Sequence, residues 1–243
     1  MNQTHRFREA ARGQFLGRDA KKRRMSWPLR VASLALTVVA LVVLLRAPAP
    51  QPATPENIQA VFRTYKDAVL KGDGAAAAAV LSQDTVDWYA ESQQLALHGT
   101  KDQLQKLQPL QRFQALAFRY RTDPHVLRTL SPRQVIAYAV EQGWMGKSTL
   151  ERTDIGDVKI AGDTAEAEVT VDGKPAGQQY NFMREQGQWR FDQLPLLASG
   201  DEQLRAAAAQ RKMSEEQLIL ALLEAFSKKK VGDEIWVPPG DKN

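Results

Sequence analysis

The sequence predicts an α+β protein with an N-terminal transmembrane helix, helices packed on a curved antiparallel sheet, and a C-terminal helical tail. Three observations predict this arrangement. Residues 31–45 form an uncharged apolar run, apolar residues then recur at helical spacing up to about residue 142, and a period of two begins near residue 153. Helices followed by an antiparallel meander are typical of an α+β domain.

The basic charge of the chain is concentrated at its N-terminus. Residues 1–30 hold nine Lys and Arg against two acids, while the remaining 213 residues hold 24 basic and 26 acidic side chains. A folded nucleic-acid-binding domain carries basic residues on its own surface, so we expect no specific nucleic-acid partner. The chain has no Cys, which excludes disulfides, thiolate metal sites and Cys nucleophiles.

A transmembrane helix is predicted over residues 25–46. The apolar run is shorter than the roughly 20 residues that span a bilayer, but residues 25–30 extend it, and Arg30 and Arg46 can direct their charges towards head groups. By the positive-inside rule, residues 1–24 are cytoplasmic and the C-terminal bulk lies across a bacterial inner membrane, in the periplasm. The topology-determining cluster is Lys21, Lys22, Arg23 and Arg24.

Two other interpretations of this segment stay open. A cleaved signal peptide has the same order of charge and apolarity, although its basic region is usually shorter than 24 residues and the sequence after Arg46 lacks a clean cleavage site. A buried core helix would show a polar face, and the run contains only Ser33 and Thr37 as polar residues.

A Pro/Ala linker over residues 47–54 leads to the helical half of the exported domain, and its composition predicts an extended, semi-stiff spacer. Thr54, followed by Pro and Glu, predicts a helix start, and the sequence KGDG at 71–74 predicts its end. Further helices are expected over 75–81 and 86–97, and capping boxes at Thr100 and Ser131 predict helices near 101–110 and 132–142. Residues 113–121 fit a helix or a strand.

Four strands are predicted in the second half, over residues 153–160, 163–172, 178–185 and 188–194. In the second, Ala and Val alternate with Thr and Glu, which is typical of a strand with one wet face. Turns are expected at 161–163, at 172–177 and at Gln186-Gly187.

The opening helix with "LKGDGAAAAAVLS" and the ending "VKIAGDTAEAEVTVDG…YNFMREQGQWRFDQL" together resemble a nuclear-transport-factor-two-like (cystatin-like cone) domain. The resemblance implies such a domain over residues 55–198. That superfamily includes isomerases, dehydratases, ligand carriers and assembly modules, so the fold alone assigns no function. The layout of tail, anchor and cone is also similar to the inner-membrane scaffold subunits of type IV secretion systems.

The C-terminal extension, residues 199–243, is predicted to be helical. A helix is expected over 201–212, and a capping box at Ser214 starts a second one with an apolar stripe. Either the stripe and Trp236 fold back onto the domain, or they form a docking element for a partner. The candidate docking residues are Leu218, Leu222, Phe226 and Trp236.

Catalytic chemistry has little support in the sequence. His5, His98 and His125 lack partners at metal-ligand spacing, and the sequence around Gly146-Lys147-Ser148 lacks the first Gly and the preceding strand of a phosphate loop. If side chains converged on a general-base site, they would have to come from Asp84, Asp87, Tyr89 and His98. We therefore predict no catalytic, cofactor-binding or metal-binding residues and no cofactor.

The expected function is a non-catalytic, membrane-anchored periplasmic binding or assembly module, a subunit or scaffold of an envelope complex. Its expected partners are the lipid bilayer and either another protein or further copies of the chain in a homo-oligomer. The alternative is a small-molecule-binding or hydrolytic cone. A deep cavity with Asp, His or Tyr pointing into it favours the alternative, and a cone interior filled by Trp or Phe favours the assembly module.

Overall fold

The computed structural model describes residues 49–227 and 230–239. The predicted basic tail 1–24, with Lys21, Lys22, Arg23 and Arg24, and the whole predicted membrane helix 25–46 lie outside these residues, as does His5. Across the described ranges, every helix is too short or too polar to cross a bilayer. The described residues form one compact α+β unit.

Eight helices precede the sheet in the described part of the chain, and most begin where the sequence supplies a cap. The Thr54 hydroxyl accepts from the Asn57 N–H, Gly72 ends the first helix at φ 76°, and capping boxes form at Thr100 and Ser131. Residues 113–121, for which a strand had been an alternative, are helical. The helices are α2 (Pro55–Lys71), α3 (Gly74–Ala79), α4 (Gln83–His98), α5 (Lys101–Gln105), α6 (Pro109–Arg121), α7 (Pro124–Thr129), α8 (Pro132–Glu141) and α9 (Lys147–Arg152).

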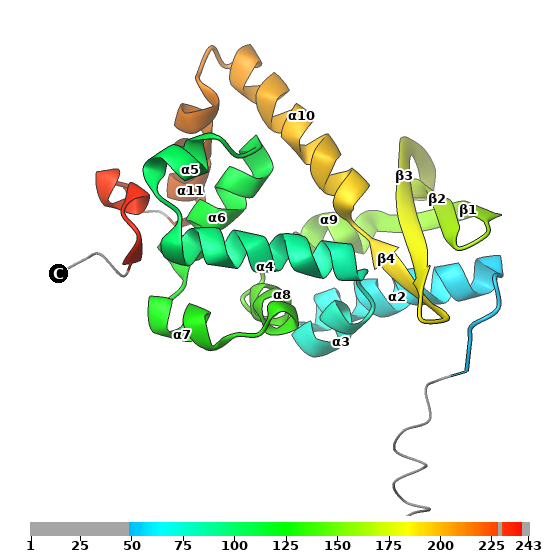
Figure 1. The fold of residues 1–243 in the computed structure, drawn as a ribbon. Coiled ribbons are helices and arrows are strands. Elements are labelled where there is room, and N and C mark those ends of the chain that lie inside the picture. Colours follow the sequence, from blue (N-terminus) through cyan, green and yellow to red (C-terminus); the bar gives the residue numbers. More distant parts are fainter. Residues whose placement is uncertain (1–48, 228–229, 240–243) are drawn as a thin grey trace, which may run out of the picture. The chain divides into compact units, whose positions relative to one another are not determined.

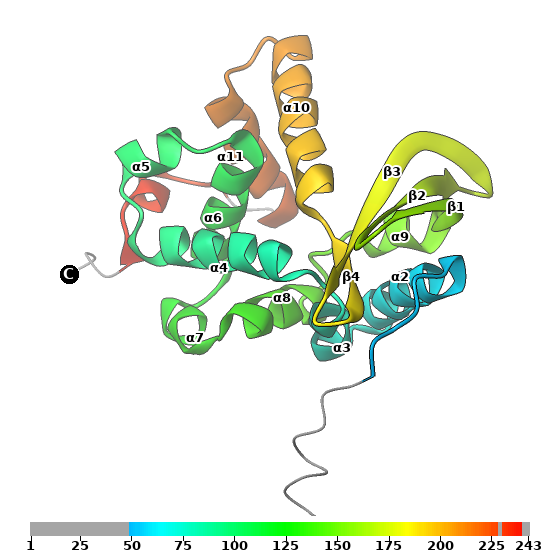
Figure 2. The same ribbon diagram turned by 45° about the vertical axis from the view of Figure 1, so that its right-hand side comes forward.

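The sheet is a four-stranded antiparallel meander in the order β1-β2-β3-β4. Figure 1 shows it beside α2 and α9, and Figure 2 shows the strong curvature of β3. The predicted turn at residues 174–177 is wrong, because Asp172 and Gly173 close a two-residue hairpin with φ of 51° and 74° and the next strand begins at once. The strands are β1 (Thr153–Ala161), β2 (Thr164–Val171), β3 (Lys174–Glu185) and β4 (Gln188–Asp192).

A first core lies between α2 and the sheet. Phe62 and Tyr65 from α2 meet Phe191 of β4 at ring-centroid distances of 5.9 and 5.1 Å, and Phe182 of β3 lies 5.3 Å from the same ring. Aromatic pairs in this range add to the free energy of burial. The core therefore fixes the inner face of the sheet against the opening helix.

A second core includes the C-terminal extension, which consists of α10 (Leu194–Gln210), α11 (Glu215–Ser227) and the 3₁₀ helix η1 (Asp233–Trp236). The predicted helix 201–212 begins earlier, at Leu194, so the predicted boundary between residues 198 and 199 falls inside α10. The buried residues of the second core come from α5, α6, α11 and η1. They are Leu104, Ala115, Leu116, Ala117, Ile219, Leu223, Ile235 and Trp236.

The described part of the predicted linker, residues 49–54, is fixed to the β3–β4 hairpin. The Gln51 N–H donates to Gly187 O at 2.7 Å, Arg184 donates to Gln51 O at 2.6 Å, and the Trp189 indole N–H donates to Pro52 O at 3.2 Å. These bonds span more than 130 positions of sequence, so periodicity within the linker could not predict them. These bonds make the segment a strap on the domain and not the free spacer that its composition predicts.

Candidate functional site

A small cavity lies between α2, α9, the sheet and the start of α10. Its volume is about 220 Å³, below the roughly 300 Å³ at which ligand pockets typically begin. Phe62, Phe182, Phe191 and Trp189 are each at most 1 % exposed and fill the surrounding space. No Asp, Glu or His lines this cavity. The lining residues are Tyr65, Met145, Gly146, Thr149, Leu150, Thr153, Tyr180, Phe191, Gln193 and Leu196.

Two tyrosines and a glutamine supply polar groups to this cavity. Burial raises the pKa of Tyr65 to about 12, and the Gln193 side chain partly offsets this effect. Burial also raises the pKa of Tyr180. Both phenols are therefore neutral at pH 7 and can donate or accept a hydrogen bond, but neither is poised as a general base.

The one converging set that the sequence offered does not form. Asp84, Asp87 and His98 are exposed on α4, whereas Tyr89 is buried with its hydroxyl 3.9 Å from the Met145 sulfur. His125 is exposed at the start of α7, and the residues described in the structure contain no cluster of His, Cys, Asp or Glu that could hold a metal ion. The chemistry of a hydrolytic centre is thus missing from this group of residues.

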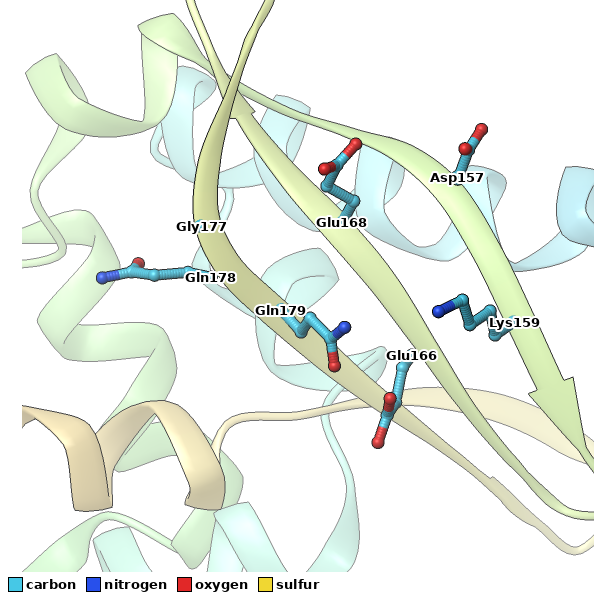
Figure 3. Close-up of a pocket in the computed structure, with 7 residues that line it drawn as sticks. All are labelled: Asp157, Lys159, Glu166, Glu168, Gly177, Gln178 and Gln179. Atoms are coloured by element: carbon cyan, nitrogen blue, oxygen red, sulfur yellow. The ribbon is translucent and has the colours of Figure 1, made fainter.

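A hollow of about 560 Å³ lies over β1, β2 and β3 (Figure 3). Lys159 is paired in register with Glu166, and Glu168 with Gln179, so the hollow carries ladder pairs of a polar sheet face. Gln178 points away from the others in Figure 3. We interpret this hollow as the solvated side of the sheet. Its lining residues are Asp157, Lys159, Glu166, Glu168, Gly177, Gln178 and Gln179.

A third hollow, which we name the α6–α11 groove, lies between α6, the loop from α8 to α9, and α11. It has a volume of about 260 Å³. Phe113 and Phe226 face each other with ring centroids 6.3 Å apart, and the Arg121 guanidinium carbon lies 4.3 Å from the centroid of Trp144. The groove thus combines aromatic surface with one positive charge. Its lining residues are Phe113, Gln114, Ala117, Arg121, Gly143, Trp144, Gly146 and Phe226.

The four candidate docking residues divide into two pairs. Leu218 and Trp236 are only 2 % and 5 % exposed, so they belong to the folded domain, as the fold-back interpretation has it, and a partner cannot reach them. Leu222 is half-buried. Phe226 is 60 % exposed and reaches the α6–α11 groove, so the docking prediction now rests on the last turns of α11.

Sequence reasoning missed two buried arginines on α6, Arg112 and Arg119. Each donates to backbone carbonyls near the C-terminal end of another helix, where unpaired carbonyls and the helix dipole favour positive charge. A usable signal was their spacing of seven, with Ala115 and Leu116 between them on the same helix face. The acceptors of Arg112 are Leu104, Gln105 and Leu107, and those of Arg119 are Leu95, Ala96, Gly99 and Ile235.

Comparison with protein-family models found no match, and comparisons with curated proteins and with solved structures found none either.

Proposed function

We propose that the chain is a non-catalytic binding or assembly module, anchored in a bacterial inner membrane by residues 25–46, with a nuclear-transport-factor-two-like domain in the periplasm. The observation that carries the non-catalytic part is the cone interior. Aromatic rings fill it, the remaining cavity is about 220 Å³, and no acid or histidine reaches that cavity. A domain with a filled interior is better suited to bind a partner through its surface than to bind a substrate inside.

The topology part of the proposal rests on the sequence, through the apolar run and the cluster Lys21–Arg24. The absence of Cys makes a clean test possible, because one introduced thiol reports one position. We expect a membrane-impermeant maleimide to label Gln178→Cys, which is exposed on β3, in intact spheroplasts. Thr4→Cys should react only after the membrane is permeabilised. Labelling of both variants, or of neither, in intact spheroplasts contradicts the topology.

The assembly part is tested by the native mass of the full-length protein, cross-linked in its own membrane before extraction with mild detergent. A discrete species that contains further subunits, or more than two copies of the chain, supports the proposal. A monomer or simple homodimer with nothing attached refutes it.

A second candidate function, small-molecule binding in the cone, is favoured by one observation: Tyr65, Tyr180 and Gln193 direct polar groups at the cavity. It requires a ligand that fits about 220 Å³. A Tyr65→Phe variant should then lose ligand-dependent thermal stabilisation while it retains any association with partners. Screening of small uncharged ligands by thermal shift, with wild type and this variant side by side, tests the candidate.

A further inference from the structure

The α6–α11 groove shows an exposed aromatic residue where most large apolar side chains of the domain are buried. Among the described residues, the large hydrophobic side chains that remain exposed are Val126, Phe226 and Val237. Of these three, only Phe226 lines one of the hollows described above. Phe113, opposite it, is half-buried. The two rings are a tilted pair in contact with each other, and together they form an aromatic surface against which an apolar side chain can pack.

Arg121, which lines the same groove, has unused hydrogen-bonding capacity. Within the described residues it forms no hydrogen bond and no ion pair, in contrast to Arg112 and Arg119 on the same helix, which donate to three and four carbonyls. Its guanidinium stacks on Trp144, and stacking leaves the N–H groups at the edge of the plane free. Burial lowers its pKa from the usual value, but a guanidinium stays charged at neutral pH.

The charge around the groove is complementary to an anion. None of its lining residues is acidic. Arg121 is its one charged lining residue among those the structure describes. A cation that is partly removed from water and lacks an anionic partner binds a carboxylate more strongly than a fully solvated one does.

We propose that the α6–α11 groove binds an acidic, extended segment of a partner protein. A carboxylate of that segment pairs with Arg121, and a neighbouring large apolar side chain packs against the solvent-accessible surface of Phe113 and Phe226. A peptide fits better than a compact ligand because three separate segments of the chain line the groove and its Phe226 remains 60 % exposed. This inference rests on the proposed assembly function and names the chemistry of the partner.

The test uses full-length protein in mild detergent and fluorescein-labelled octapeptides. Each peptide contains one glutamate and one phenylalanine, separated by zero, one or two alanines, and a matched series carries glutamine in place of glutamate. Fluorescence anisotropy measures each dissociation constant at low and at high salt. We expect the best glutamate peptide to bind about ten- to hundredfold more tightly than its glutamine counterpart, because a charged hydrogen-bonded pair is replaced by a neutral one.

Two variants and one control locate the binding. Arg121→Gln should abolish the preference for glutamate, and Phe226→Ala should weaken both peptide series about equally. Val126→Ala removes another exposed large hydrophobic side chain, on α7 and outside the groove. It should change the binding of neither peptide series. Phe226 is exposed, so its truncation should leave the fold intact, which circular dichroism verifies. Equal binding of both series, a glutamate preference retained in Arg121→Gln, or no binding by the panel at about 1 mM peptide overturns the inference.

The native-mass experiment separates failure of this inference from failure of the proposed function. If the wild-type complex forms and Arg121→Gln leaves it unchanged, the groove assignment is wrong and the assembly function stands. If the wild-type chain carries no partner at all, the assembly function fails regardless of the peptide result.

Discussion

Replacement of Arg119 by Met should destabilise the whole domain. Arg119 is 7 % exposed and donates four hydrogen bonds of 2.7 to 3.0 Å. Three acceptors lie at the C-terminal end of α4, and the fourth is Ile235 O in η1. The side chain therefore joins α4 and α6 to the C-terminal extension, and Met retains its apolar stem without the donors.

The size of the effect follows from the carbonyls left behind. A buried acceptor that loses its partner costs about 1–3 kcal/mol. Water can reach part of a helix C-terminus, so the sum is smaller than four full penalties. We expect a loss of about 3–5 kcal/mol, comparable to breaking a buried charged contact. For a domain of this size, that corresponds to a fall in Tm of about 6–20 °C.

The assay is thermal and urea unfolding of the full-length protein, followed by circular dichroism. Arg121→Met is the matched control, because it lies two residues away on α6 and donates to no carbonyl. It should cost about 1 kcal/mol or less, chiefly from lost stacking on Trp144. If Arg119→Met costs no more than Arg121→Met, the carbonyl cluster does not stabilise the domain and the reasoning is refuted.

Three further predictions test the packing and the strap. Gly74→Ala places its Cβ 2.2 Å from Ala137 O, so α3 and α8 must separate. We expect the free energy of unfolding to fall by about 3 kcal/mol. An unchanged Tm would contradict this close approach. The pKa of Tyr65 is raised to about 12, so the neutral phenol contributes about 3 kcal/mol to stability, which is present below pH 10 and lost as the pH rises through 12. In urea unfolding, the free energy of unfolding should therefore fall less steeply at alkaline pH in Tyr65→Phe than in the wild type. Equal slopes would argue against burial of the phenol. Gly187 and Gly173 share a left-handed φ, but only at Gly187 would an added Cβ meet the strap, at Pro50. Gly187→Ala should therefore cost about 1 kcal/mol more stability than Gly173→Ala and speed hydrogen exchange of the strap amides. Equal losses of stability in the two variants would mean that the strap adds no stability.

Local signals explain why much of the fold was predictable. Thr54, Thr100 and Ser131 start helices as their caps indicate, because each side chain satisfies an N–H group that the first helical turn leaves unpaired. The period of two in β2 reflects one wet and one buried face. These signals act over three or four residues, so a single sequence contains them.

Two errors concern turn-forming residues that continue an element, and a third concerns contacts between distant parts of the chain. Pro175 and Gly177 are typical turn residues, yet they continue β3, because the hairpin needs only Asp172 and Gly173. Residues 194–200 contain Pro and Gly and suggested no helix, although Pro is tolerated in the first turn of α10. Nothing in the sequence of the linker indicates its attachment to β3 and β4.

The candidate site was less predictable than the fold. Phe226 was recognised from its helical stripe, but Arg121, Trp144 and Phe113 meet it only through the packing of α6 against the loop after α8. Periodicity assigns charged residues to water, so a partly buried arginine without an acid has no signature in a single sequence.

The second core also has a consequence for biosynthesis. Leu104 and Leu116 are covered by residues of α11 and η1, and Ile235 lies 116 positions after the arginine that holds it. Because a chain is made from its N-terminus, the apolar face of α6 has no cover while the intervening segment is being translated. Slow translation between α6 and η1 would lengthen that exposure, and chaperones that bind apolar segments would have their best opportunity during this interval.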